Sequence, residues 1–356
     1  MNAPLKYVHI GVGGFGQHWC KEFLPRLSQL GLAVPIAAVD IDAEVLKKAK
    51  DQLGLKEDQL FTSAKQALDS CKPDFVTIVV PPSFHEEMVD LALSRGCHIL
   101  SEKPIADTME ASCRIYRKVS RADRKMAVTM SHRFDQDKQS LEAAIKSGKY
   151  GALNYVVHRF THNCRAYGSW GAKFRHEIPD PLLIEGTVHH FDMLRALTGS
   201  NAKKVYAVTW NPPWGEYKGD STGLITIEME NGVKCMYEGA KANASSLNGW
   251  GYDYMRAECS DGTLELDRRK LRLWRGGPWE PPTSEELPLI EQPVWRNAWL
   301  AEMFCKWLLG GPALANTLED NIQCAALLFA AISSAHTGTV VDVQAFLKEH
   351  LARIPK

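Results

Sequence analysis

The stretch VHIGVGGFGQHW, residues 8–19, decides the fold of this chain, because an apolar run ends there in a cluster of glycines. The residues of the cluster are Gly11, Gly13, Gly14, Phe15 and Gly16. In the pattern G-x-G-x-x-G between a strand and a helix, the first glycine allows a tight turn and the second lets a diphosphate approach the backbone. The third allows close packing of the helix on the strand. Taken alone, the pattern also fits an ordinary tight turn.

An acidic residue at the end of the next apolar run supports dinucleotide binding. Asp40 closes the run 33–40, at roughly the 20-residue spacing beyond the glycines that a ribose-binding acid requires. A carboxylate there repels a 2′-phosphate, and no arginine follows in VDIDAE, residues 39–44. We therefore expect NAD rather than NADP, with FAD as the remaining dinucleotide. Asp40 as a helix N-cap is the alternative, but Asp42 suits that role better.

Continuous apolar runs alternate with helical patterns up to residue 131. The runs are YVHIGVG (7–13), AVPIAAVD (33–40), DFVTIVV (74–80), HILSEK (98–103) and MAVTMS (126–131). Strands that helices cover on both faces have such runs, whereas half-solvated strands alternate. We therefore predict an α/β, Rossmann-type, doubly wound parallel sheet for a dinucleotide-binding domain over residues 1–131.

The pattern changes after an amphipathic helix predicted at 135–148. Residues 221–239 and 257–267 alternate as hairpins do, and Asn231-Gly232 in the first favours a type I′ turn. Further elements are expected as a strand at 203–210, helices at 295–309 and 317–335, and a turn-rich loop at 275–288. The second domain, 132–356, is therefore predicted as α+β, with a large, mainly antiparallel open sheet for substrate binding and oligomerisation.

The composition limits the classes of function and partner. Lys plus Arg balance Asp plus Glu at 42 each, so no basic surface predicts nucleic-acid binding. No apolar run reaches the roughly 20 residues that a membrane span needs. The first residues lack the pattern of a secretory signal, which predicts a cytoplasmic protein. Nine scattered cysteines without C-x-x-C predict reduced thiols and no thiolate metal site.

The mainly apolar segment LLIEGTVHHFDMLR, residues 182–195, contains polar residues at regular spacing. On an α-helix, offsets of four and seven place Glu185, His189 and Asp192 close to one line. Imidazole groups titrate near neutral pH, and a neighbouring carboxylate fixes their tautomer, so His189 is a candidate general base and acid. A solvated Glu–His contact is the structural alternative. His190 points elsewhere on the helix, and the spacing is not H-E-x-x-H, so no metal is expected.

A second candidate follows the fifth run. Lys103 stands at the carboxyl ends of the parallel strands, where ligands bind in open α/β sheets. A lysine surrounded by apolar side chains loses solvation of its charge. This lowers its pKa and favours proton transfer. From the residues alone, a surface lysine paired with Glu102 is the favoured interpretation.

Four features together resemble one known family. They are the glycine pattern, the loop from Pro81 to His85, Glu102-Lys103-Pro104 at a strand end, and the helix with His189 and Asp192. This combination is similar to the Gfo/Idh/MocA family of glucose-fructose oxidoreductase and inositol dehydrogenase, over nearly the whole chain. Glu185 departs from the family pattern, which has Asp at that position, and this puts its ordinary role in doubt.

The resemblance implies an NAD-dependent dehydrogenase that oxidises a hydroxyl of a sugar or polyol, including an anomeric one, by hydride transfer to nicotinamide. It implies Lys103, His189 and Glu185 as catalytic residues, with the first two converging at the nicotinamide. The implied cofactor-binding residues, beyond the glycine cluster and Asp40, are Pro81, His85, Glu102, Lys103 and Arg133. Relatives are commonly dimers or tetramers, so we expect a homodimer or homotetramer through the C-terminal sheet.

The loop 164–181 offers substrate-binding candidates. Trp170 suits the apolar face of a sugar ring, and Arg175 suits hydroxyls or a carboxylate, although ordinary packing would also explain both. Asp192 would bind a substrate hydroxyl or form an ion pair with Lys103. Three alternatives stay open: a non-catalytic, NAD-sensing regulatory protein on the same fold, a reductase of keto-sugars that uses the same residues, and a dehydrogenase of non-sugar dihydrodiols.

Overall fold

The computed structural model describes residues 3–355, which form two compact units. The first unit comprises 3–134, 294–322 and 350–355, and the second comprises 135–293 and 323–349. The sequence-based division placed everything after residue 131 in one domain. The contacts instead assign two C-terminal segments to the first unit, because an apolar helix in one of them completes its core.

The first unit contains a six-stranded sheet in the order β3-β2-β1-β4-β5-β6, with every neighbouring pair parallel. The strands are β1 (Leu5–Ile10), β2 (Ala33–Val39), β3 (Leu60–Phe61), β4 (Phe75–Ile78), β5 (His98–Ser101) and β6 (Met126–Val128). The predicted doubly wound parallel sheet is confirmed. Only the two-residue β3 lies outside the runs that the sequence indicated.

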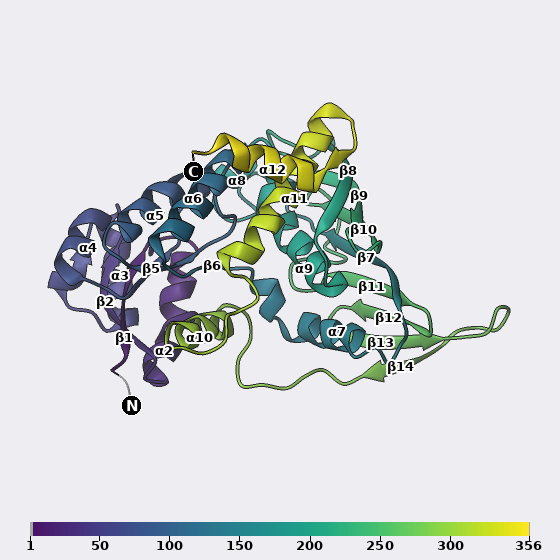
Figure 1. Cartoon of the computed structure of the whole chain (residues 1–356), viewed down its shortest axis with the longest axis horizontal. Helices are drawn as coiled ribbons and strands as arrows, with labels where there is room; N and C mark the ends of the chain where they lie inside the picture. The colour runs from purple at the N-terminus through teal and green to yellow at the C-terminus, as the bar shows by residue number, and fades with distance from the viewer. Residues whose placement is uncertain (1–2, 356) are drawn as a thin grey trace. The chain divides into compact units, whose positions relative to one another are not determined.

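Helices form two groups around this sheet. The elements are α1 (Gly16–His18), the π-turn η1 (Trp19–Phe23), α2 (Pro25–Gln29), α3 (Ala43–Leu53), α4 (Ala64–Cys71), α5 (His85–Leu93), α6 (Met109–Ala122) and α10 (Arg296–Leu308), with short 3₁₀ turns η2 (Glu57–Gln59), η3 (Pro82–Phe84) and η4 (Ser131–Phe134). Helix α5 contacts α4 and α6, whereas α2 contacts η1 and α10. Figure 1 shows α4, α5 and α6 on one side of the strands and α2 and α10 on the other.

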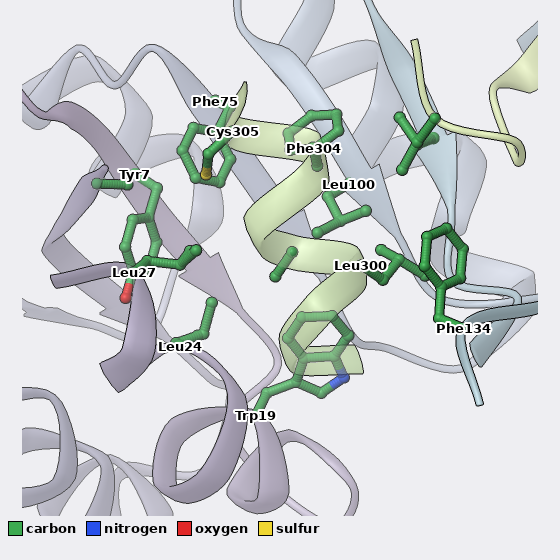
Figure 2. Close-up of a cluster of buried hydrophobic side chains, with 14 residues drawn as sticks. Tyr7, Trp19, Leu24, Leu27, Phe75, Leu100, Phe134, Leu300, Phe304 and Cys305 are labelled. Atoms are coloured by element: carbon green, nitrogen blue, oxygen red, sulfur yellow. The ribbon is translucent and has the colours of Figure 1, made fainter. Parts of the chain in front are cut away.

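The core of the first unit includes side chains from far along the chain. Figure 2 shows Leu300 and Phe304 of α10 among Tyr7, Phe75 and Leu100. The Tyr7 and Phe75 rings stack at 5.3 Å, and Phe304 meets Phe75 edge-on at 5.5 Å. Each of these side chains is at most 1% exposed. Burying one large apolar side chain contributes roughly 1.5–3 kcal/mol, so α10 is an integral part of this unit.

The second unit contains a nine-stranded sheet in the order β14-β13-β12-β11-β7-β10-β9-β8-β15. Its strands are β7 (Leu153–Thr161), β8 (Ala202–Trp210), β9 (Thr222–Met229), β10 (Lys234–Ala240), β11 (Tyr254–Cys259), β12 (Gly262–Asp267), β13 (Lys270–Arg275), β14 (Thr283–Leu287) and β15 (Val341–Asp342). Only the central β7–β10 pair is parallel. The predicted mainly antiparallel sheet is confirmed.

Two local predictions in this unit were wrong. Asn231-Gly232 does not form a type I′ turn, because that turn needs positive φ at both residues and only Gly232 has it, at 88°. The Met229 N–H donates to the Val233 carbonyl, so the hairpin has a three-residue loop that ends in a left-handed glycine. The predicted loop at 275–288 contains β14, whose polar side chains gave no strand signal.

The two faces of this sheet differ. Helices α7 (Gln136–Lys146) and α9 (Val188–Thr198) pack on one face, through contacts to β7, β12 and β13 (Figure 1). On β9 the predicted buried face of Ile225, Ile227 and Met229 is confirmed, each at most 2% exposed. The other face exposes large apolar side chains of β8, β9 and β10, namely Tyr206, Val208, Trp210, Leu224 and Met236.

The remaining helices are short or C-terminal. They are α8 (Phe174–Glu177), the π-turn η5 (Leu183–Thr187), α11 (Leu318–Thr337) and α12 (Val343–Arg353). Among residues 3–355, no helix combines the length and apolar character that crossing a membrane requires.

Candidate functional site

The glycine loop of the first unit has no room for a side chain at Gly11 or at Gly16. A Cβ on Gly11 would lie 2.2 Å from the Val79 carbonyl oxygen, and one on Gly16 would lie 2.0 Å from the Gly11 carbonyl oxygen. Gly11 and Gly14 have φ of 86° and 51°, a region that favours glycine. Phe15 is 42% exposed at the tip of the loop. The loop therefore brings bare backbone to the carboxyl end of β1, as the approach of a diphosphate requires.

Asp40, at the end of β2, holds this loop in place. Its Oδ2 accepts hydrogen bonds from the backbone N–H groups of Val12 and Gly13, both at 2.9 Å, and its Oδ1 accepts from the Asp42 N–H at 3.0 Å. Asp42 accepts from the Glu44 N–H and caps α3, which confirms the sequence interpretation of that residue. Asp40 thus has a structural task beyond the ribose contact that the sequence predicted.

The loop after β4 lies against the glycine loop through Val79, and it leads to Pro81 and His85. The His85 ring is fully buried between backbone carbonyls, with Nε2 2.9 Å from the Val80 oxygen and Nδ1 3.0 Å from the Pro104 oxygen. Burial lowers the pKa of His85, so its neutral ring donates one of these bonds. His85 therefore ties the loop after β4 to the segment that contains Lys103.

Glu102 and Lys103 follow β5 at the same edge of the sheet. Trp19 Nε1 donates to the Glu102 carboxylate at 2.9 Å, and burial raises the pKa of that carboxyl group. A hydrogen bond of this kind contributes roughly 1.5–3 kcal/mol when the acceptor is charged, which anchors the strand end that carries Lys103. Glu102 is only 8% exposed, so it is not a surface carboxylate, and the nearby charge of Lys103 acts against the effect of burial on its pKa.

Arg133 lies in η4, just after β6, and is 8% exposed. Its Nη2 is 3.2 Å from a carboxylate oxygen of Asp320, and its Nη1 donates to the Ala315 carbonyl at 3.4 Å. The C-terminal segment of the first unit therefore holds Arg133. A cofactor contact of this residue stays a prediction.

In the second unit, the segment with the polar stripe is not a regular α-helix. Leu183–Thr187 is a π-turn, in which the Val188 N–H donates to the Leu183 carbonyl five residues back, and α9 begins at Val188. The wider turn means that the α-helical offsets from Glu185 do not apply. The place of Glu185 on one stripe with His189 and Asp192 therefore stays a prediction, and the π-turn itself is a feature frequent at functional sites.

The side chains of Glu185, His189 and Asp192 are all buried, and each has a polar or aromatic neighbour. Arg175 Nε is 3.1 Å from Glu185 Oε2. His189 is 4% exposed and meets the Trp250 ring edge-on at 5.2 Å. Asp192 is fully buried, with its Oδ1 3.6 Å from Arg195 Nη1.

Trp170, predicted as a sugar platform, packs in an aromatic cluster rather than standing alone. Its ring lies 5.6 Å from Trp250 and 6.0 Å from Phe160, and the buried Lys241 ammonium lies 4.8 Å above it. Lys241 Nζ also donates to the Pro181 carbonyl at 2.7 Å. No sequence motif singled out Trp250 or Lys241, although the Gly-Trp-Gly run at 249–251 marks a loop with a large aromatic side chain.

The two units present different chemical groups, and these suit different ligands. The first unit offers bare backbone and an acid, Asp40, at one sheet edge, which suits the diphosphate and ribose of a dinucleotide. The second unit offers an imidazole, His189, beside the Trp250 ring, which packs on Trp170, and it also holds the Arg175–Glu185 ion pair. Such groups suit a polar ligand with apolar faces.

Comparison with known proteins supports this division. Residues 5–130 match the GFO/IDH/MocA oxidoreductase family with an NAD-binding Rossmann fold, and residues 139–265 match the GFO/IDH/MocA C-terminal domain. The uncharacterized protein y4oX of Sinorhizobium fredii is 46% identical over 351 residues, 97% of each chain. An inositol 2-dehydrogenase of Pseudarthrobacter chlorophenolicus is 26% identical over 361 residues, 99% of each chain.

A solved structure shows the same fold. An oxidoreductase from Agrobacterium radiobacter, in complex with NAD+, L-tartaric acid and magnesium, superposes with a TM-score of 0.82 at 21% identity, over 96% of this chain and 99% of that one. The two family matches together cover most of the sequence in the expected order. The chain therefore belongs to the GFO/IDH/MocA family of oxidoreductases.

Proposed function

We propose that this protein is an NAD-dependent dehydrogenase of a sugar or polyol. The observation that carries the proposal lies within the first unit: Lys103 follows β5 at the sheet edge where the glycine loop follows β1. The loop after β4 lies between them, with Val79 against Gly11 and the Val80 and Pro104 carbonyls on either side of the His85 ring. A lysine beside a dinucleotide-binding loop is placed for proton transfer near the reactive end of that ligand. The polyol specificity is supported by the similarity to an inositol 2-dehydrogenase.

The residues fit the cofactor. The glycine loop would receive the diphosphate, because Gly11 and Gly16 allow its tight turn and the space around Gly14 is open. Asp40, at the end of β2 beside the loop, would face a ribose. When bound, nicotinamide accepts a hydride from the carbon that bears the substrate hydroxyl. This chain supplies the proton acceptor: Lys103 or His189 takes the hydroxyl proton, and the carbon becomes a carbonyl. Glu185 and Asp192 would orient the substrate, and Trp170 and Arg175 would bind it.

Two rival functions use the same residues. A reductase of keto-sugars would run the reaction backwards, with Lys103 or His189 donating the proton. A regulatory protein that senses NAD would bind the dinucleotide without turnover. The buried position of His189 beside the Trp250 ring favours an enzyme, because a sensor has no need for an imidazole there.

A screen of pentoses, hexoses and inositols with NAD tests the proposal. We expect at least one compound to produce the absorbance band of reduced nicotinamide, and the same compound with NADP to react more slowly. The matched control is His189→Asn, which removes the imidazole base and should abolish the signal. Tight NADH binding without turnover on any compound, in either direction, would instead support the sensor.

We also propose that the exposed apolar face of the second unit binds a second copy of the chain. Val208 and Leu224 are paired neighbours on β8 and β9, and such a patch is unusual on a monomer. Both signs of charge border it, in the Lys203–Glu228 and Arg159–Glu238 pairs, as a self-complementary interface requires. The protein would work in the cytoplasm, where its nine thiols, all free in the structure, stay reduced.

Light scattering coupled to gel filtration tests the interface. We expect an oligomeric wild type, and Leu224→Lys should give the mass of one chain, because burying an unpaired ammonium costs several kcal/mol. Leu30→Lys changes an exposed apolar residue of the first unit, 44% exposed, and should leave the mass unchanged. A monomeric wild type would contradict the proposal.

A further inference from the structure

A buried hydroxyl joins the π-turn to the helix that follows it. The Tyr237 side chain extends from β10 on the helix-covered face of the second sheet and is fully buried. Its oxygen accepts a hydrogen bond from the Thr187 hydroxyl at 3.0 Å and lies 2.8 Å from His190 Nδ1. Thr187 ends the π-turn and His190 belongs to the first turn of α9. One strand residue therefore contacts both sides of the junction.

The burial of these hydrogen-bonded side chains indicates which atoms carry the protons. Burial raises the pKa of Tyr237, so the phenol keeps its proton, and burial lowers the pKa of His190, so the imidazole is neutral. The Thr187 hydroxyl lies within hydrogen-bond distance of two acceptors, the Leu182 carbonyl at 3.2 Å and Tyr237 at 3.0 Å. We assign its proton to the shorter contact, and the phenol proton of Tyr237 then points to His190 Nδ1. The single N–H of the ring is then on Nε2, which faces Asp253 Oδ1 at 3.4 Å.

A buried ion pair between Lys138 and Asp253 ends this hydrogen-bond network. Lys138 Nζ of α7 is 3.1 Å from Asp253 Oδ2, and both residues are fully buried. Desolvation acts to lower the pKa of Lys138, but Asp253 and Asp137 outweigh it and the pKa is raised. The ammonium thus holds the Asp253 carboxylate in place, and Asp253 orients the His190 ring.

We propose that Tyr237 is a positioning residue: its hydroxyl locks the π-turn onto α9 and so fixes where Glu185 and His189 stand. This inference rests on the proposed dehydrogenase function. His189 directly precedes His190, so a rotation of the helix that releases His190 also moves His189. Displacements near 1 Å reduce catalysis by about 100-fold even when the residue touches no substrate.

The test is Tyr237→Phe, which deletes the hydroxyl and keeps the ring. We expect kcat to fall about 10- to 100-fold, KM to change little, and the primary deuterium isotope effect on hydride transfer to rise as chemistry becomes slower. A purely structural role would lower the melting temperature without changing the isotope effect. The control is Tyr254→Phe, which removes the hydrogen bond to Glu265 on β12 and should leave all three kinetic values unchanged.

Thr187 gives a second pair of variants in case Tyr237→Phe folds poorly. Thr187→Val removes the donating hydroxyl at nearly constant volume and should reproduce the kinetic defect, whereas Thr187→Ser retains the hydroxyl and should restore activity. Equal activity of the valine and serine variants would overturn the inference.

A measurement without turnover separates this inference from the proposed function. In ¹⁵N spectra, His190 should carry its proton on Nε2 in the wild type, and the Nδ1 signal should shift in Tyr237→Phe. A protonated Nδ1 in the wild type would overturn the proposed order of hydrogen bonds. An inactive wild type with the expected His190 signals would refute the dehydrogenase function alone.

Discussion

Lys103→Ala is expected to lower kcat by at least ~100-fold, the scale of a positioned acid or base, while NADH binding stays close to that of the wild type. The side chain follows β5, and its removal leaves the glycine loop and the Asp40 contacts intact. Turnover with the best substrate of the sugar screen measures the first effect. Fluorescence titration with NADH measures the second.

The control for this variant is Lys47→Ala on α3. Lys47 pairs with Glu44 on the surface, with 64% of its side chain exposed, so its removal should change neither quantity. Near-normal turnover of Lys103→Ala would refute its catalytic assignment. A large loss of NADH binding would assign Lys103 to the cofactor site and leave His189 as the proton acceptor.

Asp40→Ser is expected to shift the preference between the two nicotinamide cofactors toward NADP by about 10- to 100-fold, because the change removes a negative charge that repels the 2′-phosphate. The structure adds a second effect. The serine no longer accepts from both Val12 and Gly13, so the glycine loop loses its brace and NAD affinity falls as well. Initial rates at varied NAD and NADP concentrations measure both.

Asp42→Ser is the matched control, since it makes the same substitution two residues further along. Serine is as good an N-cap as aspartate, so α3 keeps its cap and the cofactor preference should not change. A wild type that already prefers NADP would show that the argument from Asp40 is wrong.

The sequence predicted the first sheet well because its strands are buried on both faces, and continuous apolar runs follow from that burial. It did not reveal β7, the central strand of the second sheet. The helix-covered face of β7 carries His158, a fully buried imidazole whose pKa burial lowers to about 4. A polar residue in a core interrupts the alternation that marks a strand. Strand β14 was hidden for the opposite reason, because nearly all of its side chains are exposed.

The sequence predicted those parts of the candidate site whose function follows from residue type. It did not predict the parts whose positions depend on packing. Glycine spacing and the Glu102-Lys103-Pro104 run identified the nucleotide edge. The π-turn at Leu183–Thr187 was not predictable, because its residues are compatible with an α-helix and contacts such as Thr187–Tyr237 select the wider turn. Trp250 lies about 60 residues from His189 in the sequence, and only the folded chain brings the two rings together.

The position of α10 has a consequence for synthesis on the ribosome. Leu300 and Phe304 complete the core around Tyr7 and Phe75, yet they are made after the entire second sheet. Domains usually fold in the order in which they emerge. Here the amino-terminal half keeps apolar surface uncovered until α10 has left the ribosome. We therefore expect the nascent chain to need protection from aggregation until then, and a truncated product that ends at Phe134 to aggregate.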